Sequence, residues 1–341
     1  MSRRSRVTIR DVAARAGVSI TAVSHALNDK GTLSQATRER VREVARDLGY
    51  QADNIARALR TSETGVIGLV LRPLDESGDY HPLWSGIYTE FSGAAALAAA
   101  DLGLSLMLLP NLGSGRHSPL ALSLDGYVVA DPRPGDPVVQ MLEGRGVPLV
   151  TAGSDSRGYG GPWVAADHAG NTSRMLDFLA STGAREIAFV ASSEDTSWND
   201  DGVDAYEKWC ERRGIVPLTL RIPEASGEEG GFDLARREWS ARQPDAVYCL
   251  SGRHATGIQR RLREIGVRIP EHVQIAAALD SEYTRSAGIT TLDLHISEGA
   301  YAAVTLLAGM IGDGVTAPTA PVAPIEGSIT ARASTRAARM P

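Results

Sequence analysis

A short stretch near the N-terminus carries side chains that could contact DNA bases. Ile20, Thr21, Ser24 and His25 lie close together, and each offers a hydrogen-bonding group or an apolar contact to a base edge. The surrounding chain is basic: residues 1–62 hold 12 Lys and Arg against 6 Asp and Glu, whereas the whole chain of 341 residues has a net charge of −6. A basic end on an acidic body is the asymmetry expected when one end contacts a polyanion.

Three short helices are predicted to position these residues. The first begins at Thr8 and ends at Gly17, the second spans residues 20–27, and the third spans residues 35–48. Two short helices joined by a glycine-containing turn and braced by a third are typical of a helix-turn-helix, whose second helix enters the major groove of DNA. From the spacing alone, a small helical bundle with a solvated basic face is the alternative.

This region resembles the opening of the lactose-repressor (LacI/GalR) family of bacterial transcription factors. The similar segments, in one unbroken register, are 7–19 (VTIRDVAARAGVS), 22–28 (AVSHALN), 37–41 (TRERV), 48–50 (LGY) and 55–59 (IARAL). The resemblance implies a homodimeric repressor that binds a palindromic operator in double-stranded DNA. The DNA-binding residues that it implies are Thr8, Ser19, Ile20, Thr21, Ser24, His25, Asn28, Ser34, Thr37, Ala56, Arg57 and Leu59.

The resemblance also implies a hinge helix over residues 52–61, where a simple linker is the alternative. Leu59 would insert between the central base pairs from the minor groove, with Ala56 beside it. A helix this short is not stable alone, so its order would depend on DNA. Two departures concern the operator, since Ala22 stands where the family usually has Thr and His25 where it often has Arg. We therefore expect a half-site that differs from the common family sequence.

Beyond residue 64, short aliphatic runs alternate with helical stretches. Most of the runs are apolar throughout, as strands covered on both faces must be, which predicts parallel sheets of an α/β body behind a small all-α head. The expected strands are 66–71, 104–109, 126–130, 148–151, 187–190, 246–250 and 274–279, and the expected helices include 169–181, 204–213 and 256–265.

The body resembles the effector domain of the same family, which has the fold of type I periplasmic sugar-binding proteins. The similar segments are 125–129 (DGYVV), 165–168 (AADH), 183–190 (GAREIAFV), 266–273 (GVRIPEHV), 289–292 (ITTL) and 331–335 (ARAST). The implied domains are a DNA-binding head (1–51), a hinge and linker (52–63) and an effector-binding and dimerisation domain (64–341). Its two lobes would be approximately 64–165 plus 294–327, and 166–293, with a ligand cleft at the strand ends between them.

Several residues are candidates for binding a small-molecule effector, such as a sugar or a related metabolite. By resemblance, Asp280 would accept hydrogen bonds from a hydroxylated ligand, and Asp167 matches an aspartate at a strand end. We expect Trp198 and Asn199 on a loop after a strand, where they would supply a stacking face and an amide. The last candidates, Trp84, His81 and Tyr88, follow the first strand, where the family places an aromatic over the ligand; each aromatic could instead only pack the lobe surface.

The cleft also departs from the family pattern. The chain has no Arg between Arg185 and Arg212, where sugar-binding and purine-binding members usually carry one. Ser251-Gly252 replaces an Asn-Asp pair, and Asp293-Leu294 replaces a polar residue after Thr290-Thr291. The ligand is therefore left open, and a regulator with a vestigial cleft is the alternative.

Other functional classes are disfavoured by what the sequence lacks. It has no Gly-x-Ser-x-Gly elbow, no His-x-x-x-His pair and no P-loop, so we expect neither an enzyme nor a cofactor. Cys210 and Cys249 are too few for a metal cluster and are expected to be buried thiols. No signal peptide or membrane-spanning run is evident, which favours a soluble cytoplasmic protein over a periplasmic solute-binding module.

Overall fold

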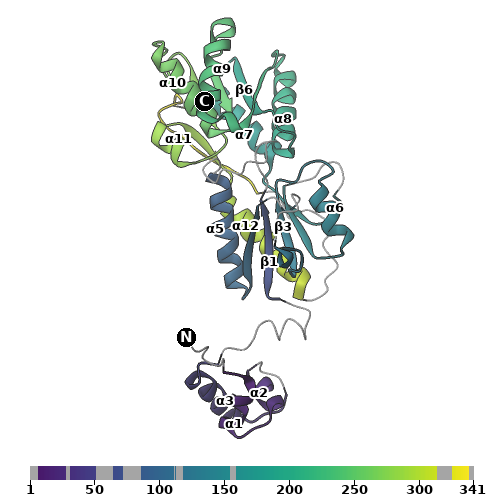
Figure 1. Cartoon of the computed structure of the whole chain (residues 1–341). Coiled ribbons are helices and arrows are strands. Elements are labelled where there is room, and N and C mark those ends of the chain that lie inside the picture. Colours follow the sequence, from purple (N-terminus) through teal and green to yellow (C-terminus); the bar gives the residue numbers. More distant parts are fainter. Residues whose placement is uncertain are drawn as a thin grey trace. The chain divides into compact units, whose positions relative to one another are not determined.

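The computed structural model describes residues 7–27, 31–50, 64–71, 86–110, 112, 118–153, 159–312 and 325–337. The chain divides into two compact units, Met1–Thr64 and Gly65–Pro341 (Figure 1). The boundary between them adjoins the end of the linker that we expected at residue 63. The first unit is called the head and the second the body.

The head is built from three helices around a small apolar core. They are α1 (Ile9–Ala16), α2 (Ile20–Leu27) and α3 (Gln35–Asp47). Their buried side chains meet in one cluster, formed by Val12, Ala13, Ala16, Val23, Ala26, Val41 and Ala45. Gly17 takes a φ of 66°, which ends α1 in a left-handed conformation and lets α2 begin three residues later.

The first lobe of the body contains a five-stranded parallel sheet. Its order is β2-β1-β3-β4-β5, with β1 at Val66–Leu71, β2 at Ser105–Pro110, β3 at Gly126–Ala130, β4 at Leu149–Ala152 and β5 at Trp163–Val164. Helices α5 (Gly86–Asp101) and α12 (Ile296–Gly312) pack against each other on one face (Figure 1). The other face is covered by α6 (Pro137–Gly144) and the short helix η2 (Pro119–Leu122).

The second lobe contains a six-stranded sheet of order β11-β10-β9-β8-β6-β7. Its strands are β6 (Ile187–Ser192), β7 (Leu218–Ile222), β8 (Ala246–Cys249), β9 (Gln274–Ala277), β10 (Thr290–Asp293) and β11 (Ser328–Thr330). All of the pairs are parallel except β10 with β11. The parallel pairing expected from the uniformly apolar runs is therefore confirmed in both lobes.

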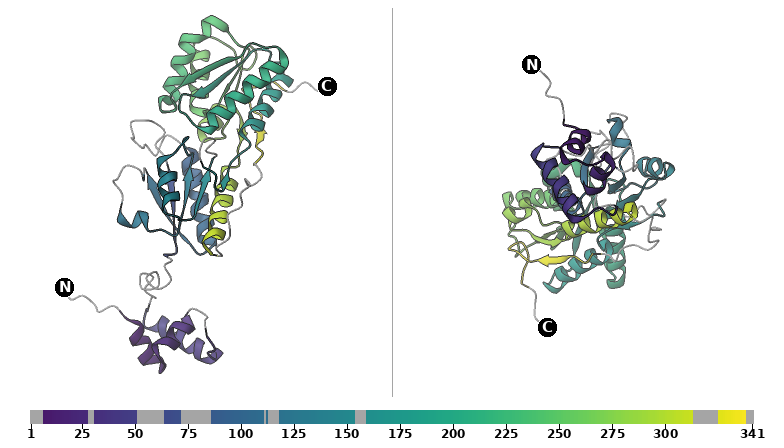
Figure 2. Two further views of the ribbon diagram at one scale, coloured as in Figure 1. Left: turned by 90° about the vertical axis from the view of Figure 1, so that its right-hand side faces the viewer. Right: turned by 90° about the horizontal axis from the view of Figure 1, so that it is seen from below.

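Helices cover both faces of the second sheet (Figure 2). One face carries α7 (His168–Ser181) and α8 (Ser197–Arg213), and the other carries α9 (Gly227–Arg242) and α10 (Gly252–Glu264), with η3 (Glu224–Ser226) before α9 and α11 (Glu282–Ala287) after β9. The α9–α10 contact is tight, because a Cβ on Gly257 would lie 1.9 Å from the Glu228 carbonyl oxygen and one on Gly231 would lie 2.1 Å from that of His254. Only glycine allows this approach.

The chain passes between the lobes after β5, after β10 and before β11. These connections lie together: Ala166 forms a parallel bridge with Ile325, and the Gly327 N–H donates to Asn171 Oδ1 at 2.7 Å. Each lobe is therefore assembled from segments far apart in the sequence. Across the described residues, none of the helices has the length and apolarity needed to span a bilayer.

Candidate functional sites

The N-terminal turn of α2 exposes the side chains that were expected to meet DNA. Val23 and Ala26 are buried against the rest of the head, and this turns the opposite face of α2 outward. Ser19 and Thr21 are exposed, and Ile20 is 46% exposed although it is a large apolar residue. An exposed Ile beside two hydroxyls suits the edges of bases, where it would contact apolar groups such as the thymine methyl.

Some hydroxyls among the predicted DNA contacts also cap helices. Ser19 Oγ accepts from the Ala22 N–H at 3.1 Å, which leaves the hydroxyl proton of Ser19 directed elsewhere. Ser34 Oγ accepts from the Thr37 N–H at 3.3 Å and bonds the Thr37 hydroxyl at 2.8 Å. A hydroxyl at a helix N-terminus lies where the partial positive charge of the helix favours an anion. These positions therefore fit contacts to DNA phosphates.

Two other predicted DNA contacts, Thr8 and His25, interact with neighbouring residues of the head. The Thr8 N–H and hydroxyl both donate to the Asp11 carboxylate, at 2.8 and 2.7 Å, and these bonds lower the pKa of Asp11. The His25 ring packs on the turn at Gly31, because a Cβ there would lie 2.5 Å from His25 Nδ1. Ser24 is half-buried. The remaining predicted contacts lie outside the described residues: Asn28, Ala56, Arg57 and Leu59.

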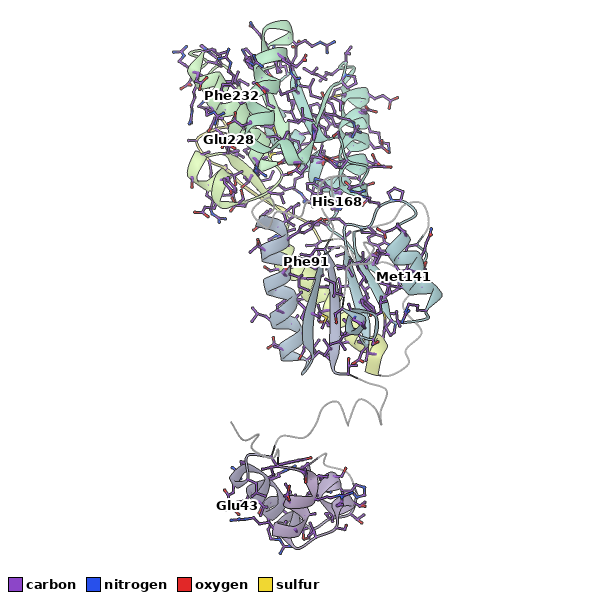
Figure 3. All side chains as sticks on the ribbon, viewed as in Figure 1. Glu43, Phe91, Met141, His168, Glu228 and Phe232 are labelled. Carbon is purple, nitrogen blue, oxygen red and sulfur yellow. The ribbon has the colours of Figure 1, made fainter. Side chains whose placement is uncertain are left out.

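The body contains a cavity between its two lobes. Its empty volume, which includes open solvent, is about 1310 Å³. Phe91 of the first lobe and His168 of the second lie at the facing ends of the two lobes (Figure 3). The strand ends of both sheets contribute, with Ala130 and Ala152 on one side and Ser192 and Leu250 on the other. This is the position expected for a ligand cleft in parallel α/β folds.

Three of the sequence-predicted effector residues line this cavity: Tyr88, Trp198 and Asn199. Tyr88 belongs to α5. The other two were expected on a loop, but Thr196 caps α8 and places both in its first turn. Helix α8 therefore begins earlier than the sequence pattern predicted, because the side chain of Thr196 accepts from the Asn199 N–H.

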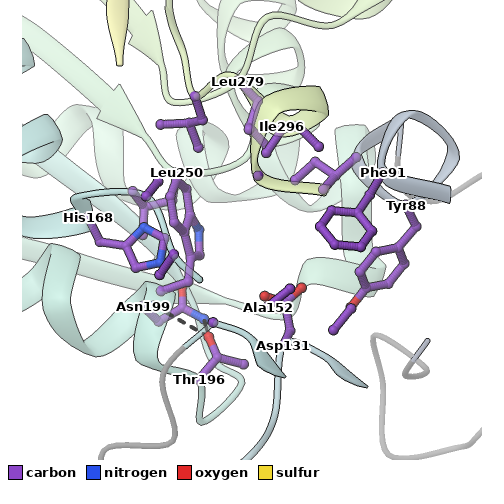
Figure 4. A pocket seen from close by; sticks show the side chains of 18 of the residues that line it. Tyr88, Phe91, Asp131, Ala152, His168, Thr196, Asn199, Leu250, Leu279 and Ile296 are labelled. Carbon is purple, nitrogen blue, oxygen red and sulfur yellow. Dashed lines mark hydrogen bonds between the residues drawn. The ribbon is translucent and has the colours of Figure 1, made fainter. Parts of the chain in front are cut away.

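The amide of Asn199 is already engaged by the protein. Its Oδ1 accepts from the Ser192 N–H at 3.0 Å, and its Nδ2 lies within 3.0 Å of Ser192 Oγ and the Glu194 carbonyl oxygen and 2.9 Å from Thr196 Oγ1 (Figure 4). An amide nitrogen has only two hydrogens to donate. Asn199 therefore shapes the cavity wall by holding the β6–α8 connection. The expected amide contact with a ligand stays a prediction.

Asp131 is a cavity residue that the sequence analysis did not name. It directly follows β3, and its carboxylate points into the space between Tyr88 and the second lobe (Figure 4). Burial raises the pKa of Asp131 to about 6, against a hydrogen bond from Tyr88 that lowers it. Its φ is +45°, a strained conformation that is more frequent at functional sites than elsewhere. Its position at the C-terminal end of a predicted strand was the sequence signal that could have identified Asp131 as a cavity residue.

His168 is a second such residue, at the start of α7 in the second lobe. Its ring meets the Trp198 ring edge-on, with the centroids 4.8 Å apart. Burial lowers the pKa of His168 to about 4, although the charge of Asp167 opposes this shift. The imidazole is therefore neutral at pH 7. Its Nδ1 is shielded from solvent and has no hydrogen-bond partner among the described residues.

Two further carboxylates line the second-lobe side. Glu194 accepts from the hydroxyl of Ser192 and from the Glu224 N–H at 3.1 Å. Glu224 accepts from the Ser251 hydroxyl at 2.8 Å. Together with Asp131 they make three carboxylates in the lining, whereas Arg133 is the one Lys or Arg among the described residues of the lining.

The two aspartates named by resemblance lie outside the cavity lining. Asp167 caps α7 by accepting from the Gly170 N–H at 2.9 Å. Asp280 is bound by Arg332 at 2.7 Å, by Arg285 at 3.2 Å and by the Thr291 hydroxyl at 3.0 Å. Asp280 thus meets three donor groups of the protein and Asp167 meets one. That either carboxylate binds a ligand stays a prediction. The expected residues Trp84 and His81 lie outside the described residues.

Neither cysteine contributes to a site. Cys210 and Cys249 are free and buried, as expected from their apolar neighbours. Within the described ranges, no three His, Cys, Asp or Glu side chains are arranged to hold a metal ion.

The head and the body each match a known family. Residues 8–53 match the bacterial regulatory proteins of the lacI family, and residues 176–335 match the periplasmic binding protein-like domain. Among curated proteins, the HTH-type transcriptional regulator CelR of Thermobifida fusca is 30% identical over 304 residues, covering 84% of this chain and 86% of that protein. The HTH-type transcriptional regulator IpsA of Corynebacterium glutamicum is 28% identical over 313 residues, with 84% and 86% covered.

Solved structures share the fold over nearly the whole chain. A Lac repressor dimer bound to operator and the anti-inducer ONPF superposes with a TM-score of 0.81 at 20% identity, covering 98% of this chain and 100% of that one. A CelR–cellobiose complex superposes with a TM-score of 0.65 at 24% identity, covering 96% and 100%. The expected fold class, a helix-turn-helix head on a two-lobed α/β body, is confirmed. Because its head matches the lacI family model and a regulator relative is 30% identical over 84% of the chain, this chain belongs to the LacI family of bacterial regulatory proteins.

Proposed function

We propose that this LacI-family regulator is a homodimeric repressor that binds a palindromic operator, and that a small molecule in the interlobe cavity changes its affinity for DNA. One observation carries the DNA-binding half of the proposal. The N-terminal turn of α2 presents Ser19, Ile20 and Thr21 outward, beside the capping hydroxyls of Ser34 and Thr37. This arrangement combines groups that contact bases with groups that position phosphates. The proposed regulator acts in the cytoplasm, where the bacterial chromosome lies.

Dimerisation is supported by an exposed apolar surface on the first lobe. Leu97 of α5, Leu102 just after it and Leu108 of β2 are 62%, 46% and 46% exposed. Strand β2 is also an edge strand of its sheet. Exposed leucines beside an unpaired edge are typical of surfaces that bind another protein. A second copy related by two-fold symmetry would cover them and place two heads on a palindromic site.

The effector half of the proposal rests on the cavity. Its lining is shared by both lobes, so a ligand that fits one arrangement of the lobes better than another shifts the equilibrium between them. Such a shift would reach DNA through the predicted hinge at residues 52–61 and Leu59. The CelR structure in complex with cellobiose supports a carbohydrate as the ligand class.

Fluorescence anisotropy on labelled duplexes tests the DNA-binding half. The duplexes are taken from the DNA that flanks the gene, and a scrambled duplex of equal length and composition is the matched control. We expect tight binding by the full chain to a palindromic duplex, with an affinity that falls steeply as salt increases because DNA counterions are released. The body alone, residues 65–341, should not bind. Equal affinity for the scrambled duplex, or equal binding by the body, would contradict the proposal.

A further inference from the structure

We infer that the cavity takes a hydroxylated ligand that is neutral or cationic, held between Asp131 of the first lobe and His168 of the second, and that it excludes anionic counterparts such as sugar phosphates and sugar acids. The inference rests on the proposed effector function and specifies the ligand class and its two anchoring residues.

The first argument for this ligand class comes from the charges of the cavity lining. Among the described residues, the lining holds three carboxylates, those of Asp131, Glu194 and Glu224, and one guanidinium, that of Arg133. Glu194 accepts hydrogen bonds from the Ser192 hydroxyl and from a backbone N–H, and Glu224 accepts one from the Ser251 hydroxyl. An anionic ligand would therefore meet a described lining of net negative charge, where like charges repel. A ligand with hydroxyl or ammonium donors meets acceptors instead.

The second argument comes from Asp131, a half-buried acceptor with one hydrogen bond from Tyr88. Tyr88 supplies one hydrogen bond to a carboxylate that can accept several. Without further donors, burial favours the neutral form of the carboxyl, as its raised pKa indicates. A ligand hydroxyl or ammonium that donates to it would stabilise the carboxylate. The strained backbone at Asp131 keeps the group aimed at the cavity.

His168 supplies the second anchor from the opposite side (Figure 4). Its Nδ1 is shielded from solvent and has no hydrogen-bond partner among the described residues, and such atoms are rare in folded proteins, so a turn of the ring toward the cavity would let a ligand satisfy it. The ring is neutral at pH 7 because its pKa lies near 4, so it offers one hydrogen bond and no positive charge to an anion. Trp198, packed edge-on at 4.8 Å, fixes the ring plane.

The remaining walls fit the same ligand class. Phe91 and Tyr88 lie on one side of the cavity (Figure 4). Trp198, from the second lobe, also lines it. An aromatic face packs well against the apolar C–H face of a sugar ring, and it also attracts an ammonium group. Apolar walls with a few placed acceptors are the usual composition of a selective small-molecule site.

The test is a thermal-shift screen of the full-length protein, followed by calorimetric titration of each hit. Probes are grouped by charge on similar skeletons: cellobiose, maltose and lactose are neutral, the β-1,4-linked glucosamine dimer is cationic, and cellobiuronic acid and maltose 6′-phosphate are anionic. A wider metabolite library is sorted into the same three classes. A ligand that binds only the folded state raises the Tm by mass action. We expect hits in the neutral or cationic class and none in the anionic class.

Two variants test whether Asp131 and His168 bind the ligand. Asp131→Asn keeps the shape and removes the charge, so we expect the Kd of a neutral hit to rise about tenfold and the exclusion of its anionic counterpart to weaken. His168→Phe keeps the packing on Trp198 and removes Nδ1, so the Kd should rise about fivefold without a change in charge preference. Asp204→Asn, at an exposed carboxylate of α8 outside the cavity, is the matched control and should change neither.

The outcomes separate this inference from the proposed function. Anionic hits that bind as tightly as neutral ones would overturn the inference and leave the effector function standing. An unchanged Kd in both cavity variants, each folded as judged by its Tm without ligand, would overturn the two anchors. No hit in any class would overturn both the inference and the effector function, while the anisotropy assay tests DNA binding independently.

Discussion

The Arg332 guanidinium lies 2.7 Å from the Asp280 carboxylate and joins the C-terminal segment to the strand ends of the second lobe. Arg332 also donates to the Ile289 carbonyl oxygen at 2.8 Å and to the Thr291 hydroxyl at 2.7 Å. Burial raises the pKa of Asp280, but the hydrogen bonds from Thr291 and Arg332 outweigh it and lower the pKa. Asp280 therefore helps to hold the C-terminal segment on the second lobe.

We predict that Arg332→Ala lowers the free energy of unfolding by about 2 kcal/mol, because it leaves a mostly buried carboxylate without its main partner. The side chains of Arg332 and Asp280 are 18% and 20% exposed. The matched control is Arg236→Ala, whose ion pair with Asp233 is 59% and 52% exposed and should contribute less than about 0.5 kcal/mol. Urea denaturation of both variants makes the comparison. Equal losses would contradict the structural role of the Asp280–Arg332 pair.

The raised pKa of Asp131 predicts a pH dependence of stability in the absence of ligand. Its folded pKa of about 6 lies above the ordinary value of 3.8, so the folded state holds this proton more tightly than the unfolded state does. The resulting stability is fully present below pH 3.8 and is lost as the pH rises through about 6. Asp131→Asn has no charge to bury and should be more stable than the wild type at pH 7, by about 2 kcal/mol.

Denaturation of both proteins from pH 4 to pH 8 measures this difference. The gap between variant and wild type should shrink as the pH is lowered, because Asp131 then becomes neutral as Asn is. A gap that stays constant across this range would show that Asp131 keeps an ordinary pKa.

The close packing of α9 on α10 predicts that one added methyl group strongly lowers the stability of the protein. In Gly257→Ala the new Cβ would lie 1.9 Å from the Glu228 carbonyl oxygen, so the two helices must separate, and we expect a loss of about 3 kcal/mol. Gly309→Ala in α12 has nothing within 4 Å of its Cβ and should be neutral or stabilising by up to about 1 kcal/mol. Thermal denaturation distinguishes them, and similar Tm values would refute the close approach.

The proposed dimer predicts that a charge on the exposed leucines separates the protomers. Leu97→Glu should convert the protein to a monomer and weaken operator binding, because burying an unpaired carboxylate in an apolar contact is costly. Val216→Glu, at a position 76% exposed on the second lobe, is the matched control. Light scattering coupled to size-exclusion chromatography reads the mass directly. A Leu97→Glu protein that remains dimeric would place the interface elsewhere.

Much of the fold follows from local patterns in the sequence. The helix caps at Thr8 and Ser34 lie three residues from their partners, Asp11 and Thr37, so both signals are readable in a short window. The uniformly apolar runs that predicted parallel sheets are likewise signals contained in a short stretch of sequence. The start of α8 was missed because Thr196 follows an irregular turn, where apolar periodicity gives no indication of a cap.

The sequence by itself determined the family, the DNA-binding head and the two-lobed α/β body, because these depend on short-range spacing and on contiguous motifs. Only the tertiary structure decided which polar groups are available to a ligand. Asp280 is bound by Arg332, which lies far along the chain, whereas Asp131 and His168 are brought to one cavity by separate sheets. A side chain is available to a ligand only when its local and distant neighbours leave it unsatisfied, and the distant ones are set by folding.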